Sequence, residues 1–230
     1  MEQHAINKIS VQENTILRTV YNYMSLGLAI TGGIAFLISR TNLMVFLARN
    51  TAVFFLIAIA QLVLVVFLSA RVRKMSPGTA FGAFILYASL NGIVFSFIFM
   101  AYTGTSIAAT FLITAGTFAG MSLYGLRTKE DLSVYGRYLI MGLWGVILAS
   151  VVNIFLQSSG LYWFISYAGV LVFVGLTAYD TQTIARWSRE AGDSASPEDC
   201  SRIAIIGALK LYLDFINLFL MLLRILGGRR

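Results

Sequence analysis

The sequence has one cysteine and one histidine, and these two shortages exclude several kinds of site. Cys200 alone can form no internal disulfide and cannot supply a multi-cysteine metal centre. His4 lies in a polar N-terminal stretch, so a histidine-rich metal centre is excluded as well. We therefore expect neither a disulfide framework nor a resident metal cofactor.

Charged residues are also scarce, at 12% of the 230 residues, whereas a soluble domain has about 25%. Hydrophobic residues make up 58%, and the mean hydropathy is +0.81. A soluble core could not bury this much apolar surface, so the chain is predicted to be an integral membrane protein in contact with lipids. The net charge of +7 does not indicate a nucleic-acid partner, because the longest basic stretch is the short run Arg71–Lys74.

Apolar runs of about 20 residues, the length that crosses a bilayer as a helix, occur seven times. Because the loops between the runs are too short to fold alone, we predict an all-α membrane protein with a single seven-span domain over residues 1–230. Residues 1–19 are interpreted as a polar, solvated tail with a weak amphipathic pattern, and the first span as its own insertion signal. The seven predicted spans are Val20–Ser39, Thr51–Ala70, Thr79–Tyr102, Thr105–Leu126, Tyr138–Leu156, Leu161–Asp180 and Ile203–Leu223.

The distribution of lysine and arginine predicts the orientation in the membrane. Twelve of the 17 basic residues fall on the side that holds the N-terminus, so this side is expected to be cytoplasmic. Arg224, Arg229 and Arg230, at the C-terminus, contradict this rule. A re-entrant hairpin in place of the last span would remove the contradiction, but Ile203–Leu223 is long enough to cross, and we favour a span.

Two of the predicted spans carry an acidic residue, Asp180 and Asp214, whereas every other acid lies in a polar stretch. An ionisable group inside a membrane costs roughly 2.5–3.5 kcal/mol on insertion scales, which makes each aspartate a functional candidate. The alternating direction of the spans puts both at similar depth if the sixth helix continues past Asp180. Arg71 and Arg73 end the second span on the same face, within plausible reach of a buried carboxylate.

Three hypotheses compete for this pair of aspartates. Lys210, four residues before Asp214, and Arg186, near Asp180, could neutralise the two acids locally. The pair could instead share a proton, because two carboxylates a few ångströms apart do not both ionise readily, and so form a proton-operated gate. Finally, the pair could be catalytic, as in an intramembrane aspartyl protease. That class needs a Gly-x-Gly-Asp arrangement and Asp214 follows Leu-Tyr-Leu, so we expect no enzyme activity.

The segments around the two aspartates resemble a known family. Gly175–Gln182 (GLTAYDTQ) and Ala208–Phe219 (ALKLYLDFINLF) are similar to the two most recognisable motifs of the Bax inhibitor, or transmembrane BAX inhibitor motif, family. The number of predicted spans and the positions of the basic loops are also similar to those of this family, over nearly the whole chain. Without a targeting tail, the sequence resembles a bacterial member of the family, and this resemblance implies an inner-membrane location. The resemblance also implies a central last helix wrapped by two three-helix layers, and a role in stress responses.

The functional implication of the resemblance is a pH-sensitive calcium leak regulated by the aspartate pair. By motif match, Asp180 and Asp214 are that pair, and Arg71 or Arg73 is the arginine that latches the closed state. Some members have an acid in the second span where this chain has Gln61, so calcium affinity here is expected to be low. Calcium takes about six to eight oxygen ligands, so the two aspartates alone predict a weak, transient site for a transported ion.

A second function remains open beside the leak. Some relatives are thought to act without transport, by binding another integral membrane protein such as a quality-control protease, and contacts between helix faces leave no motif in a sequence. Gly116 and Gly120 form a GlyxxxGly pair, which we interpret as a site of close helix packing. Tyr102, Tyr162 and Trp163 are expected to lie at the membrane interface.

Overall fold

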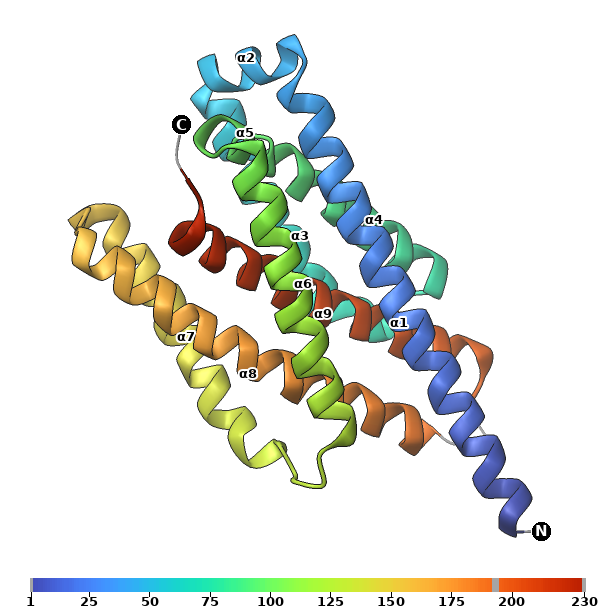
Figure 1. The fold of residues 1–230 in the computed structure, drawn as a ribbon. Helices are drawn as coiled ribbons and strands as arrows, with labels where there is room; N and C mark the ends of the chain where they lie inside the picture. Colours follow the sequence, from blue (N-terminus) through green and yellow to red (C-terminus); the bar gives the residue numbers. More distant parts are fainter. Residues whose placement is uncertain (1, 192–194, 229–230) are drawn as a thin grey trace. The chain divides into compact units, whose positions relative to one another are not determined.

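The computed structural model describes residues 2–191 and 195–228, with the side chains of all of these except 2–12 and 73. The described residues form helices and no strands (Figure 1). Seven helical segments are long and apolar enough to cross a membrane, which confirms the predicted all-α, seven-span architecture. The elements in chain order are α1 (Glu2–Ser39), α2 (Asn42–Arg49), α3 (Thr51–Arg71), the 3-10 turn η1 (Val72–Lys74), α4 (Pro77–Phe95), α5 (Ile98–Ala101), α6 (Gly104–Arg127), α7 (Ser133–Leu156), α8 (Ser159–Ala191) and α9 (Pro197–Leu226).

Two helices extend well beyond the predicted spans. Helix α1 begins at Glu2, so the predicted tail over residues 1–19 is helical where the structure describes it, and Ile16 within it is buried. Helix α8 continues for eleven residues past Asp180. Thr183, in this extension, donates to the carbonyl of Tyr179 at 2.8 Å, so its hydroxyl is satisfied by its own helix and does not end it.

Side-chain caps start two of the helices that follow short loops. Ser76 accepts a hydrogen bond from the backbone N–H of Thr79 at the start of α4, where Pro77 occupies the first turn. Thr103 accepts from the N–H of Ser106 at the start of α6. The loops at these two positions are therefore defined by local hydrogen bonds.

The chain divides into two compact units, each of which holds three of the first six spans. The first unit comprises the described parts of residues 2–102 and 186–212, with α1, α3 and α4; the second comprises 103–185 and 213–228, with α6, α7 and most of α8. Helix α9 contributes its N-terminal half to the first unit and its C-terminal half to the second. Its most apolar window is 67% buried, against 6–39% in the other six spans, as expected for a central last helix. Because α9 is one uninterrupted helix of 30 residues, the last segment is a span and not a hairpin.

The core of the first unit contains a buried polar network around Tyr212. The hydroxyl of Thr31 donates to the carbonyl oxygen of Ala88 at 2.9 Å and lies 2.7 Å from the hydroxyl of Tyr212. Because threonine has one hydroxyl proton, Tyr212 is the donor in the second bond. The ring of Tyr212 packs edge-on against Phe84 and Tyr87. A fully buried tyrosine of α9 is thus tied to α1 and α4.

Close contacts at glycine hold the helices of the second unit together. A Cβ at Gly125 in α6 would collide with the backbone carbonyl of Ala178 in α8. A Cβ at Gly136 in α7 would lie 2.5 Å from the ring of Tyr179. Figure 1 shows α7 and α8 running side by side, and their apolar side chains form one cluster with the end of α9. Small residues therefore set the approach of α6 and α7 to the segment of α8 that carries Asp180.

The GlyxxxGly pair makes no such contact with the described residues of the second unit. Both Gly116 and Gly120 are exposed, and no atom lies within 4 Å of the position that a Cβ would take. The interpretation of this pair as a site of close helix packing is therefore wrong for the described residues of the second unit.

The substitution Gly125→Ala should destabilise the protein, because overpacking against a backbone atom typically costs about 1–3 kcal/mol. Gly116→Ala is the matched control on the same helix; it should leave stability unchanged or raise it slightly, since alanine favours helix by about 1 kcal/mol over glycine. Thermal unfolding of the purified variants in detergent measures the difference. Equal melting temperatures for the two variants would contradict the packing described for α6 and α8.

Candidate functional site

Asp180 and Asp214 belong to the same compact unit, on α8 and α9 respectively. Each is only 5% exposed. Both lie inside helices that are long and apolar enough to cross a membrane. Burial of a carboxylate away from water is costly unless the group is paired, hydrogen-bonded or protonated. The two acids singled out in the sequence are thus both buried in the same part of the molecule.

A polar layer surrounds Asp180 along α8. Thr177 and Thr181 are fully buried, one turn before the aspartate and directly after it. Thr177 donates to the carbonyl of Phe173 at 2.8 Å, whereas Thr181 donates to the hydroxyl of Ser122 in α6 at 3.3 Å. The interior of the second unit next to Asp180 therefore contains hydroxyl groups in place of apolar side chains.

The buried face of α6 continues this polar layer in a way that the sequence analysis missed. Thr110, Thr114 and Ser122 are all buried, and their spacing of four and eight residues places them on one face of the helix. Thr114 donates to the carbonyl of Thr110 at 2.7 Å. The signal in the sequence was hydroxyl residues at helical spacing within an otherwise apolar run, which is easily overlooked because threonine and serine are tolerated in spans.

An aromatic contact interrupts this hydroxyl-bearing face. The rings of Phe118 in α6 and Phe215 in α9 have centroids 5.5 Å apart, and both residues are buried. Phe215 directly follows Asp214, and Phe118 lies one turn before Ser122. An apolar ring contact thus adjoins the polar layer around Asp180.

Gln182 anchors the segment of α8 that follows Asp180. Its Oε1 accepts from the backbone N–H of Leu132 at 2.8 Å, and its Nε2 donates to the carbonyl of Glu130 at 2.8 Å. Both partners belong to the loop that joins α6 to α7. Three helices of the second unit are therefore connected through one side chain, two residues from Asp180.

The other residues predicted for the site belong to the first unit. Arg71 is the last residue of α3 and its side chain is exposed, whereas the side chain of Arg73 lies outside the described residues. Lys210 and Arg186 are half-buried. Gln61 lies in α3, and its Oε1 is buried with no hydrogen-bond partner among the described residues. Asp180 and Asp214 are thus the only predicted site residues that the described structure places in the second unit.

The described residues contain no group of three or more His, Cys, Asp or Glu side chains that could hold a metal ion. Two carboxylates offer four oxygen atoms, fewer than the roughly six to eight that calcium takes. Any cation at Asp180 and Asp214 would therefore need water and backbone carbonyls to complete its shell, which is a requirement suited to passage and not to tight storage.

The sequence is similar to a known protein family and to several bacterial proteins over nearly its whole length. The profile of a family described as inhibitor of apoptosis-promoting Bax1 matches residues 13–230. The inner membrane protein YbhL of Escherichia coli is 48% identical over 217 residues, which cover 94% of this chain and 92% of that protein. A protein of Borreliella burgdorferi is 48% identical over 219 residues, covering 95% and 94% of the two chains. A protein of Rickettsia prowazekii is 43% identical over 211 residues, covering 92% and 88%.

The substitution Gln182→Ala should lower the free energy of unfolding by about 1–3 kcal/mol, because the buried N–H of Leu132 loses its acceptor. Gln182→Glu keeps an acceptor at the same position and should be milder. Denaturation of the purified variants, followed by circular dichroism, tests this order. A larger loss for Gln182→Glu would indicate that the bond to the Glu130 carbonyl, and not the one from Leu132, holds the loop.

Proposed function

The chain belongs to the Bax inhibitor family, and on that premise we propose that it is a pH-sensitive cation leak, with calcium as the transported ion. The observation that carries the proposal is the burial of Asp180 and Asp214 in one compact unit, inside two apolar helices. Intramembrane acids mark ion pathways and proton relays more often than they serve packing. Two such acids in one unit could supply both a transient binding site for a cation and a group that takes up a proton.

In the proposed gate, the aspartates carry the negative charge that holds the closed state. With one carboxylate ionised, Arg71 or Arg73 at the end of α3 pairs with it and keeps the path shut. Protonation removes the negative charge and releases the arginine. Breaking one partner of a buried ion pair costs roughly 3–5 kcal/mol, enough to change which of two helix arrangements is stable.

The path itself is proposed to follow the hydroxyl-bearing faces of α6 and α8. Thr110, Thr114 and Ser122 offer oxygen atoms along α6, and Thr177 and Thr181 offer them along α8. Oxygen ligands are those that hard cations prefer. The adjacent rings of Phe118 and Phe215 would act as the apolar constriction, since narrow hydrophobic segments exclude water and ions until they widen.

The location and orientation are proposed from independent observations. The E. coli relative is an inner membrane protein by name, which favours the bacterial inner membrane for this chain. The excess of Lys and Arg on the side of the N-terminus favours a cytoplasmic N-terminus. The acids of the gate would then respond to the pH at the cytoplasmic half of the membrane.

A second candidate function is a membrane regulator that binds another integral membrane protein and transports nothing. One observation favours it. Gly116 and Gly120 lie exposed on α6 with open space around them, and such a GlyxxxGly face accepts a close helix from a partner. Liposomes that contain this protein alone separate the two candidates, because a regulator would show no flux at any pH.

The substitution Asp180→Asn should make calcium efflux from proteoliposomes high and independent of pH. Asparagine resembles the protonated acid and cannot hold the arginine, so the closed state loses its ion pair. Asp214→Asn should have the same effect. The measurement is the rate of calcium efflux, followed with a calcium-sensitive dye at several pH values across the neutral range.

The matched control for both variants is Glu130→Gln, which removes an exposed acid whose backbone N–H and carbonyl make its hydrogen bonds in the described fold. It should retain the pH dependence of the wild-type protein. An unchanged pH profile in Asp180→Asn would rule out the gate.

A further inference from the structure

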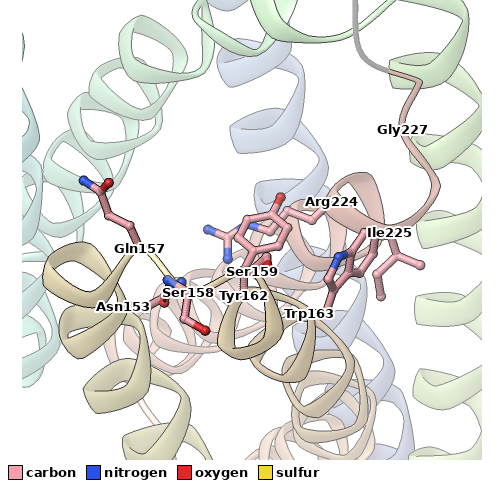
Figure 2. A pocket seen from close by; sticks show the side chains of 9 residues that line it. All are labelled: Asn153, Gln157, Ser158, Ser159, Tyr162, Trp163, Arg224, Ile225 and Gly227. Carbon is pink, nitrogen blue, oxygen red and sulfur yellow. Dashed lines mark hydrogen bonds between the residues drawn. The ribbon is translucent and has the colours of Figure 1, made fainter.

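The second unit contains a cavity that the proposed gate does not use. It has a volume of about 560 Å³ and lies where α7 ends, α8 begins and α9 ends (Figure 2). Since consecutive spans run in opposite directions, these three helix ends share one side of the membrane. Tyr162 and Trp163, which line the cavity, have rings packed edge to face at 5.9 Å. Tyrosine and tryptophan are typical of the membrane–water boundary, so the cavity lies at headgroup level.

Arg224 gives the cavity a positive charge without an acidic partner in its wall. Its guanidinium lies 5.5 Å from the centroid of the Tyr162 ring, and Figure 2 shows the two side chains together inside the cavity. No aspartate or glutamate lines the cavity among the described residues. The nearest acid along α9 is Asp214, ten residues earlier and so about 15 Å away along the helix. A half-buried guanidinium in an acid-free cavity is suited to an anion.

Further hydrogen-bond donors face the same space. Asn153 uses its Oδ1 to accept from the N–H of Ser158 at 3.0 Å, which leaves its Nδ2 group, with two hydrogens, without an acceptor among the described residues. The first turn of α8 begins at Ser159, and a helix of 33 residues carries partial positive charge at its start. The guanidinium of Arg224 and the amide of Asn153 together form a set of donors that matches the oxygens of a phosphate group, and the start of α8 adds partial positive charge.

The surroundings of the cavity distinguish a lipid from a soluble anion. Phe155, Leu156 and Phe164, which adjoin the lining residues along the chain, are 82%, 63% and 66% exposed. In a membrane-spanning helix such side chains face hydrocarbon and can contact acyl chains. The same occupant also explains why α9 carries an arginine in its last turn, on the side that the basic-residue rule predicts to be poor in positive charge.

We propose that this cavity binds the phosphate of an anionic phospholipid headgroup, with Arg224 as the charged contact and Asn153 as a second donor. The proposal rests on the cavity and its lining, and it holds whether or not the protein conducts calcium. It gives the C-terminal end of α9 a function in seating the second unit at one face of the bilayer.

The test is native mass spectrometry of the detergent-purified protein with added phosphatidylglycerol or phosphatidylcholine. The wild-type protein should retain phosphatidylglycerol preferentially. Arg224→Gln should weaken that retention at least about tenfold, and Arg224→Lys should weaken it less, because lysine keeps the charge but loses the planar fork. Arg49→Gln, at the exposed end of α2 in the first unit, is the matched control and should retain the lipid as the wild-type protein does.

Two results would overturn the proposal without any variant having to fold. Equal retention of both lipids by the wild-type protein would show that the anionic headgroup is not recognised. Displacement of the lipid by glycerol phosphate at a similar concentration would show that the acyl chains contribute nothing, and a soluble anion would then be the ligand. Resistance to glycerol phosphate, together with loss in Arg224→Gln, supports the lipid site.

Discussion

A carboxylate inside the hydrocarbon region must be paired, hydrogen-bonded or protonated, and this constraint shapes the second unit of the protein. Asp180 and Asp214 are nearly fully buried there, on α8 and α9. Buried hydroxyl groups line α8 next to Asp180 and continue on the facing side of α6. The contact at Gly125 brings these two helices close enough for the hydroxyls to meet.

Two buried polar residues of helix α9, one in each unit, lie within one helical turn of each other. Tyr212 donates into the network of Thr31 and Ala88 in the first unit, and Asp214, two residues later, belongs to the second. A rigid helix that is common to both units is well suited to transmit a change of charge, because packed helices shift as bodies and do not deform continuously. A change of protonation at Asp214 would therefore occur in a helix that contributes to both units.

Hydropathy and the rarity of buried acids were sufficient to predict the spans and the two aspartates. Each span is a long apolar run, and each of the two acids is conspicuous because it ends or interrupts such a run. The extent of α8 was harder to predict, because Thr183 follows the apolar run and looks like the end of a span, although its hydroxyl is satisfied by its own helix. The roles of the glycines depend on tertiary packing: Gly125 faces a neighbouring backbone and Gly116 faces open space, and no local pattern separates them. Arg224 was visible only as an exception to the charge rule, since its aromatic partner is more than sixty residues away in the sequence.

The central claim is that the two buried carboxylates titrate as a coupled pair. Infrared difference spectroscopy of the protein in lipid, followed across pH, reports the protonated carboxyl groups directly. The account predicts that replacing one aspartate by asparagine shifts the titration of the carboxyl that remains, because interacting sites share their protons. A remaining carboxyl that titrates as it does in the wild-type protein would show that the two acids are independent, and would contradict the account.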